Sequence, residues 1–474
     1  MTYQSIKNVV FDTAGTNTQM SALSRRIERI EQKREELWHQ LQQLGEEQNI
    51  IQRQYNCLHN SKSAIYRLPE EIFSMILEAG RDYHPDFAIT ASHVAHRWRR
   101  IALDTHRLWN VVVIAREWSE KRTLAYISRS GSVPICFSAL ITFSNMPIVA
   151  QLIETHGDSI FQLTCLMDRG VDRKIFLRRL ASVNFPILKH FAIQGRGEST
   201  TTIHELFREA CPALMSVHFD GIYVPVHLQR LPRLTAVHMS CHHLLSRNDI
   251  QELRDALVQT SIIHLELNLK DAEMIWPPDI ILNLPTLQTF SMGLRGESAM
   301  LHINGFMVAL HAPRMSALAF TGDLQDPFDA LSPQIIGWRD KFPCLQTFGC
   351  PRFKNQALEA LRLFAQAIPN LTVLKYYEEN SLFTVLQETR GSSIAWPNLR
   401  SLSLSYPRDL CCSTSAALVQ LLKTRKAFGH PIEVLMLYSF HSRKFDEELI
   451  SMVHLEPIRY DNEWPSSSSR SFED

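Results

Sequence analysis

The stretch LPRLTAVHM at residues 231–239 decides the fold, because its pattern recurs through most of the chain. Each copy has a proline after an apolar residue, a leucine or methionine two residues later, and a tail in which apolar residues alternate with others. Such a proline closes the preceding loop, the leucine anchors a core, and the alternating tail is typical of a short strand. The other clear copies begin at residues 185, 211, 284, 312, 342, 368 and 396, and looser ones begin at residues 133, 159, 261 and 430.

The spacing of these copies indicates a repeat solenoid. The intervals are unequal, for example 20 residues from Pro212 to Pro232 and 34 from Pro397 to Pro431, and leucine-rich repeats run about 20–29 residues. Strands that alternate with helices through right-handed crossovers form a curved parallel sheet with the helices outside. The sequence therefore predicts a mixed α/β fold, an irregular leucine-rich-repeat-like solenoid over residues 120–460. Its helices are expected between copies, among them residues 202–210, 249–259, 357–367 and 415–425.

Functional residues of such an array are expected on the open strand face and in the loops, because leucines at this spacing belong to the core. Four strand-borne histidines, His190, His218, His238 and His264, fall at or near equivalent positions of their copies. Two interpretations stay open at this point. The histidines line one surface, or they are ordinary outward-facing strand residues.

A second organising stretch, residues 66–113, contains two helical patterns. Leu68-Pro69 begins the first, since proline is favoured in a first turn and the glutamates that follow lie where the helix dipole favours negative charge. Gly80 is expected to end this helix as a C-cap residue. After Pro85 the second pattern predicts one helix with an apolar side formed by Ala91, Val94, Ala95, Trp98, Ile101 and Ala102.

These residues resemble an F-box, in the variant common in fungal proteins. The family begins with Leu-Pro-x-Glu-Ile and carries Val-x-x-x-Trp in a later helix, and here LPEEI starts at Leu68 while Val94 and Trp98 supply the second motif. The chain departs from the family at Ala95, where a cysteine is usual, and in a longer, more polar connection over residues 81–89. With the later Leu108-Trp109 pair, the resemblance covers residues 64–115.

The resemblance implies a substrate-recognition adaptor of a Skp–cullin–F-box type ubiquitin ligase, in which the F-box holds a Skp-type adaptor and the repeats hold an unknown protein substrate. The alternative is a non-catalytic interaction scaffold that acts outside a ubiquitin ligase. An F-box is too small to bury all its apolar residues, so its remaining face needs a partner or a neighbouring domain. The resemblance assigns eight residues to the docking face or its support, namely Leu68, Pro69, Ile72, Phe73, Ile76, Leu77, Val94 and Trp98.

Residues 21–60 predict a coiled-coil helix. Apolar residues recur four and three residues apart from Leu23 to Leu58, with Arg34 and Gln48 as the two polar exceptions, both at heptad position a. Gly45 weakens the middle of this helix by about 1 kcal/mol relative to alanine. The seam either forms a coiled coil with a partner or a second copy of the chain, or folds back against the F-box or the repeats.

Composition restricts the classes of protein to which this chain can belong. Lys plus Arg equals Asp plus Glu at 49 each, which gives no basic footprint for nucleic acid. The nine cysteines show no C-x-x-C spacing, which favours reduced thiols and a cytoplasmic or nuclear protein. No apolar run is long enough for a membrane span.

The chain lacks phosphate-binding glycine motifs and the G-x-S-x-G motif of hydrolases, so we expect no enzyme, no cofactor and no metal. His204-Glu205 begins like a zinc-protease helix, but Arg208 replaces the second histidine. Cys241 and the two histidines after it alternate between strand faces and are poorly placed to share an ion. Residues 1–20 and 461–474, rich in polar residues, are expected to be disordered.

Overall fold

The computed structural model describes residues 13–458, apart from 82–83, 85, 196–200, 203–205, 207–210, 224–227, 229–230, 242–245, 271–274, 296–298, 325–334, 351, 354–356, 377–379, 391–392, 405–411 and 439–446. The chain forms two compact units, Met1–Asp104 and Thr105–Asp474. The boundary falls inside the range 64–115 that the F-box resemblance covers, so the Leu108-Trp109 pair belongs to the second unit. The tail predicted at 461–474, and residues 1–12, lie outside the described residues.

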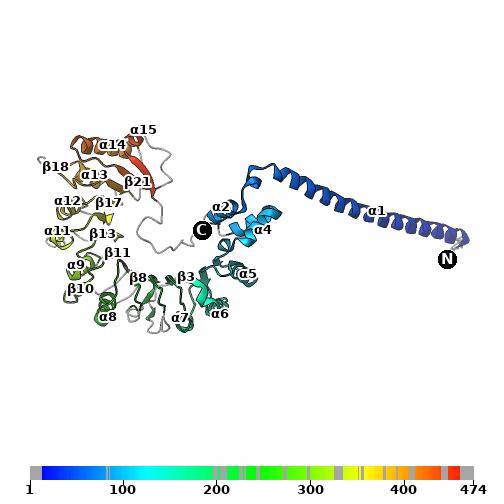
Figure 1. The fold of residues 1–474 in the computed structure, drawn as a ribbon, viewed down its shortest axis with the longest axis horizontal. Helices are drawn as coiled ribbons and strands as arrows, with labels where there is room; N and C mark the ends of the chain where they lie inside the picture. The colour runs from blue at the N-terminus through cyan, green and yellow to red at the C-terminus, as the bar shows by residue number, and fades with distance from the viewer. Residues whose placement is uncertain are drawn as a thin grey trace, which may run out of the picture. The chain divides into compact units, whose positions relative to one another are not determined.

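The second unit is built on one sheet of 14 strands, whose order in the sheet follows the chain from β1 to β22 (Figure 1). Every neighbouring pair in this sheet is parallel. The strands are β1 Val111–Ile114, β2 Ile135–Ile141, β3 Ile160–Met167, β4 His190–Gly195, β6 Ser216–Asp220, β8 Ala236–Cys241, β9 His264–Lys270, β11 Thr289–Arg295, β13 Ala317–Thr321, β15 Thr347–Gly349, β17 Val373–Tyr376, β20 Ser401–Leu404, β21 Val434–Tyr438 and β22 His454–Ile458.

Each copy of the sequence pattern supplies one strand of this sheet, which confirms the predicted solenoid at the level of its strands. The end strands β1 and β22 have no copy of the pattern, because neither follows a proline–x–leucine loop closure. Pro457 lies within β22, where its missing N–H is tolerated because an edge strand has a neighbour on one side only.

A row of apolar residues crosses the whole sheet and explains why the strands stack. In-register pairing joins one residue of each strand to its neighbour, and all but Leu455 at the edge are buried. Successive strands align their cores in this way because a one-residue slip would turn these side chains to the other face. The row consists of Val112, Phe137, Leu163, Phe191, Val217, Val237, Leu265, Phe290, Leu318, Phe348, Leu374, Leu402, Leu435 and Leu455.

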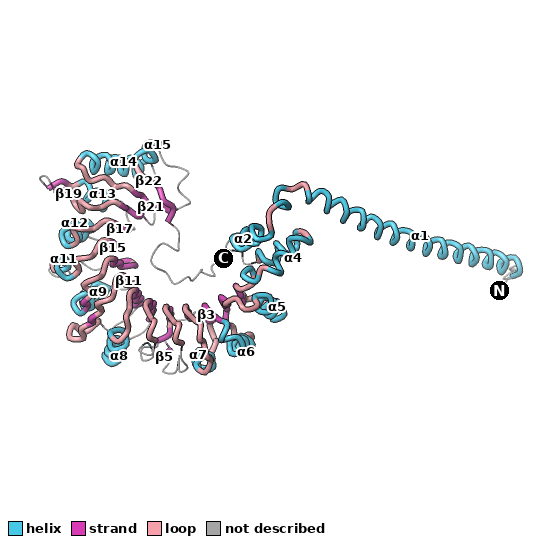
Figure 2. Tube along the Cα trace, in the orientation of Figure 1, coloured by secondary structure: helices cyan, strands magenta, loops and turns pink. Residues whose placement is uncertain are grey.

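Helices of the second unit lie along one face of the sheet, on its outer side (Figure 2). The predicted helices at 249–259, 357–367 and 415–425 are confirmed, and the one at 202–210 falls largely outside the described residues. These helices are α5 Glu120–Ser130, α6 Met146–His156, α7 Arg173–Ala181, α8 Arg247–Val258, α9 Ala299–Ala309, α11 Trp338–Lys341, α12 Ala357–Ala367, α13 Asn380–Gln387, α14 Cys412–Ala427 and α15 Glu447–Met452. Two-residue strands add small ladders at β5 Thr201–Thr202, β7 Ile222–Tyr223, β10 Leu282–Asn283, β12 Leu310–His311, β14 Asp323–Leu324, β16 Arg352–Phe353, β18 Thr389–Arg390 and β19 Ser393–Ile394.

In the residues that the structure describes, the secondary structure of the first unit is helical throughout. It contains α1 Thr13–Ser61, the short η1 Ala64–Arg67, α2 Glu70–Arg81, α3 Phe87–Val94 and α4 His96–Asp104. Helix α1 is one continuous helix that begins earlier than the expected start near Ser21. Within the described ranges of both units, every helix is too short or too polar to cross a lipid bilayer.

Two details of the first unit differ from the sequence expectation. Gly80 does not cap α2, which continues to Arg81; instead its missing Cβ leaves room for the ring of Phe87, whose Cζ lies 2.3 Å from where a Cβ would be. The single helix expected after Pro85 is broken at Ala95, which is extended at φ −158° and ψ 162°. The break lets α3 and α4 both pack on α2, and no glycine or proline marks it in the sequence.

Candidate interaction surfaces

The first candidate surface lies on α2 and on the ends of α3 and η1. The structure separates the eight residues assigned by the F-box resemblance into three groups, and their role in partner binding stays a prediction. Phe73 and Leu77 are buried, and Leu68 and Trp98 are half-buried. The exposed members are Pro69, Ile72, Ile76 and Val94.

Aromatic packing supports this surface from beneath. The rings of Phe73 and Trp98 meet edge to face with centroids 4.7 Å apart. Arg97 donates to the carbonyl oxygens of Tyr66 and Leu68, the latter at 2.6 Å, and its guanidinium lies 5.0 Å from the Tyr66 ring. These contacts tie η1, α2 and α4 together, so Phe73 and Trp98 support this surface from beneath while Ile72 and Ile76 stay exposed.

Sequence reasoning missed one member of this surface. Met75 is 64% exposed, more than Ile72 at 45% or Ile76 at 44%. It lies between the two isoleucines on α2, so the run Ile72–Ile76 presents three exposed large apolar side chains. Methionine fills irregular contacts well, so its presence in an apolar run was a usable signal.

The second candidate surface is the open face of the sheet, opposite its helices. Strand register places His218 of β6 beside His238 of β8, which in turn pairs with Glu266 of β9. His190 and His264 belong to the neighbouring row on the same face, which is occupied by Ser216 on β6 and Ala236 on β8. The four histidines therefore share the open face of the sheet, and whether they bind a partner there stays a prediction.

Contacts among these side chains form a connected polar cluster. The imidazoles of His218 and His238 stack with centroids 3.7 Å apart at 25°, and His238 Nδ1 lies 2.8 Å from Glu266 Oε2. The Asn268 amide lies 3.4 Å from both His238 Nε2 and Glu266 Oε1. Gly293 makes this placement possible, because a Cβ there would lie 1.8 Å from the Asn268 oxygen.

The flanking histidines bond to hydroxyl groups of the next strands. His190 Nδ1 lies 2.8 Å from Ser216 Oγ, and His264 Nδ1 lies 2.7 Å from Thr289 Oγ1. Within the described part of the chain, the buried hydroxyl of Ser240 on the same face has no hydrogen-bond partner. A buried polar atom without a partner costs free energy.

Burial favours the neutral form of three imidazoles on this face, those of His190, His218 and His264. It lowers the pKa of His218 to about 3, with a further lowering by His238 and a smaller opposing effect of Asp220. Burial also lowers the pKa of His190, together with the charge of Lys189, and that of His264. A neutral imidazole offers one donor and one acceptor. These neutral imidazoles can therefore donate and accept hydrogen bonds with uncharged groups, such as the peptide groups of a protein partner.

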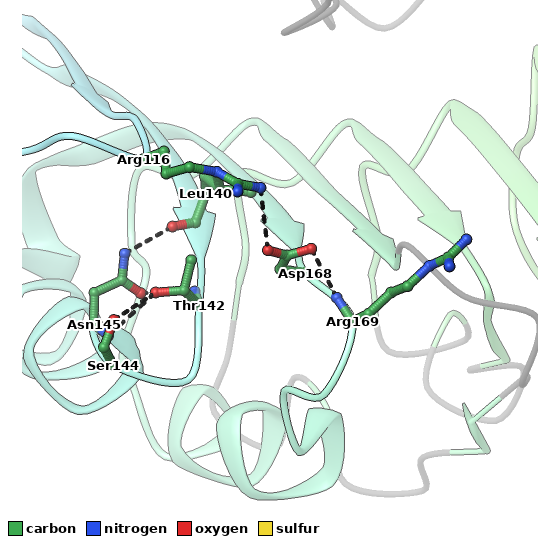
Figure 3. Close-up of polar contacts among 7 residues, drawn as sticks. All are labelled: Arg116, Leu140, Thr142, Ser144, Asn145, Asp168 and Arg169. Atoms are coloured by element: carbon green, nitrogen blue, oxygen red, sulfur yellow. Dashed lines mark hydrogen bonds and ion pairs between the residues drawn. The ribbon is translucent and has the colours of Figure 1, made fainter.

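The loops after β1, β2 and β3 form a third polar site at one edge of the sheet (Figure 3). Asn145, which is buried, fastens the β2 loop: its amide donates to Leu140 O at 2.9 Å and its carbonyl accepts from Thr142 N at 2.8 Å. Figure 3 also shows Arg116, in the loop after β1, reaching Asp168, in the loop after β3, with 3.5 Å between Nη2 and Oδ2. Phe143, 81% exposed, lies in the loop that Asn145 holds.

None of these surfaces brings together a set of metal ligands. Among the residues that the structure describes, no three His, Cys, Asp or Glu side chains are grouped to hold an ion. The histidines that follow Cys241 lie outside the described residues. Burial raises the pKa of the Cys165 and Cys211 thiols to about 12, so both are poor nucleophiles.

Comparisons with known proteins add little to this picture. No family model matches the chain, and no curated protein matches it. Among solved structures the chain is similar to the crystal structure of Listeria monocytogenes InlP, at 15% sequence identity and a TM-score of 0.22. The match covers 53% of this chain and 58% of that one, less than two thirds of its length. The solenoid assignment rests on the strand order described above and not on this likeness.

Proposed function

We propose that this protein is a non-catalytic interaction adaptor that links a Skp-type protein of a cullin ubiquitin ligase to a protein substrate. The first unit would dock the Skp-type protein, and the open face of the sheet would hold the substrate. The mechanism is proximity, since binding raises the effective concentration of substrate lysines at the ligase. The eight residues from Leu68 to Trp98 assigned by the F-box resemblance would form the docking face and its support.

The observation that carries the proposal is the exposed apolar run Ile72–Ile76 on a helix whose other face is buried. Apolar residues exposed side by side on a soluble surface are a mark of an interaction site. The buried Phe73 and the half-buried Trp98 hold this run in place, so docking would need little rearrangement. The F-box resemblance names the kind of partner, and the hydrogen-bonding side chains on the open face support a substrate role for the second unit.

The test is capture of a purified Skp-type protein, alone and with its cullin, by the full chain. Ile72→Asp with Ile76→Asp places two charges on the surface without touching the buried Phe73 or Leu77. We expect this variant to lose at least about thirtyfold in affinity, since a single anchor of this kind is worth about 2 kcal/mol or more and each 1.4 kcal/mol is about tenfold. Ile281→Asp is the matched control, because Ile281 is 63% exposed and lies in the second unit.

Three outcomes separate the alternatives. Loss of capture in the double variant alone supports the adaptor. Capture of the Skp-type protein without its cullin favours a scaffold that acts outside a ligase. Equal capture by the native chain, the double variant and the control contradicts docking through α2.

A further inference from the structure

Helix α1 carries an apolar seam that the described residues of the first unit leave uncovered. Every large apolar member of the seam is between 49% and 69% exposed. These residues are Leu23, Ile27, Ile30, Leu37, Leu41, Leu44, Ile51, Tyr55 and Leu58. A seam at heptad spacing over this length is the geometry of a coiled coil, in which a and d residues insert between those of a facing helix.

We propose that α1 pairs with α1 of a second copy of this chain in an antiparallel coiled coil, with Trp38 of each helix lying over Gly45 of the other. This inference is independent of the proposed ligase role.

The antiparallel register accounts for the whole seam from Ile27 to Leu58. With Leu41 facing Leu44 at the centre, each a residue from Ile27 to Leu58 faces a d residue of the other copy, and Leu23 alone of the seam lies outside this paired length. The five kinds of layer are Ile27 with Leu58, Ile30 with Tyr55, Arg34 with Ile51, Leu37 with Gln48, and Leu41 with Leu44. Because the arrangement has twofold symmetry, each of these contacts occurs twice.

Charge at the polar a position distinguishes the two orientations. In a parallel pair Arg34 faces Arg34, with Lys33 at the flanking g position of both helices, so four positive charges gather at one layer. In the antiparallel pair Arg34 faces Ile51, and the flanking residues there, Gln52 and Gln54, are uncharged. These like charges meet in the parallel pair but not in the antiparallel one, so they disfavour the parallel orientation.

Trp38 and Gly45 supply complementary size at position e. In this antiparallel register e residues flank e residues of the other helix, which brings Trp38 opposite Gly45. Trp38 is 59% exposed, and a Cβ added to Gly45 would meet no atom within 4 Å, so the chain itself does not require glycine there. Gly45 weakens the helix, and no contact within the chain requires it. Its presence is explained if the indole of Trp38 from a second copy packs over it.

Cross-linking of the full chain tests the orientation. Ile27→Cys and Leu58→Cys variants, both in a Cys57→Ser background, are oxidised alone and as a mixture. We expect a cross-linked dimer in the mixture and none with either variant alone, above the background of the chain without an added cysteine. In a parallel pair the two positions lie about 46 Å apart, at about 1.5 Å per residue. A dimer formed by Ile27→Cys alone, or no cross-link at all, overturns the proposal.

A size swap tests the Trp38–Gly45 contact by sedimentation equilibrium. We expect the native chain to dimerise, Trp38→Gly and Gly45→Trp each to weaken the dimer about tenfold, and the variant with both changes to recover it. Recovery follows because the swap again places tryptophan opposite glycine, whereas single changes leave two glycines or two tryptophans facing. A native chain that sediments at its monomer mass of 54.5 kDa, or singles that bind like the native chain, contradicts the proposal, as does a double variant no better than the singles.

Discussion

Two rows of apolar side chains run through this chain, and they differ in burial. The row that begins at Val112 crosses the 14-stranded sheet and is buried in every strand but the last. The row that begins at Leu23 runs along α1 and stays about half to two-thirds exposed. Each follows the period of its own secondary structure. A repeat solenoid covers each copy with the next copy, whereas a lone helix has no neighbour, so the same apolar content gives a core in one region and an unoccupied surface in the other.

The largest expected effect comes from removing a member of each row. Phe290 is fully buried and stacks on Phe306 with ring centroids 4.7 Å apart at 7°. Phe290→Ala should lower the free energy of unfolding of the second unit by about 3–5 kcal/mol, because it leaves a cavity. Leu37→Ala on α1 should leave that free energy unchanged within about 0.5 kcal/mol. Urea unfolding followed by tryptophan fluorescence measures the unfolding free energy of both variants. Equal losses of free energy in the two variants would contradict the difference in burial between the rows.

Burial on the open face of the sheet gives the second prediction, a pH dependence. The pKa of His218 is lowered to about 3 in the folded chain, chiefly by burial, against about 6.5 when unfolded. Between these values the unfolded chain binds the extra proton, so stability is fully present above about pH 6.5 and is lost as the pH falls toward 3. From pH 7 to pH 5 this histidine should contribute a loss of roughly 2 kcal/mol.

The control for this prediction is His218→Gln, which keeps a hydrogen-bonding side chain but cannot titrate in this range. His190 and His264, whose pKa values are also lowered by burial, remain in the variant. The difference in pH dependence between the native chain and the variant therefore reports His218 together with its coupling to the stacked His238. If the unfolding free energies of the two chains fall in parallel between pH 7 and pH 5, His218 does not titrate in this way.

The two rows also show what the sequence could predict. The strands were predictable because proline, leucine and alternation are local signals repeated in each copy. The stacking of His218 on His238 was not, because it depends on the register between two strands. The break at Ala95 carries no local signal either, and follows from the packing of α3 and α4 on α2. The heptad pattern predicts that another helix packs on the apolar seam of α1. A pattern in one helix does not identify which helix that is.

The last prediction concerns hydrogen-bonded polar side chains, which are buried in the second unit and exposed on α1. Asn145 is 4% exposed and its side chain satisfies Leu140 O and Thr142 N in the loop shown in Figure 3. Asn56 on α1 accepts from Gln52 at 2.9 Å on an exposed surface. Asn145→Ala should cost about 1–3 kcal/mol of unfolding free energy, because buried backbone groups lose their partners while water cannot replace them.

Asn56→Ala is the matched control and should change stability by less than about 0.5 kcal/mol, because water replaces the lost bond. Thermal unfolding of the full chain, with the two variants beside the native protein, measures the difference. If Asn145→Ala changes stability as little as Asn56→Ala, the hydrogen bonds of Asn145 do not stabilise the loop after β2. The contrast between the two regions would then hold for apolar side chains only. A loss confined to Asn145→Ala extends the contrast between the two regions from apolar burial to hydrogen bonding.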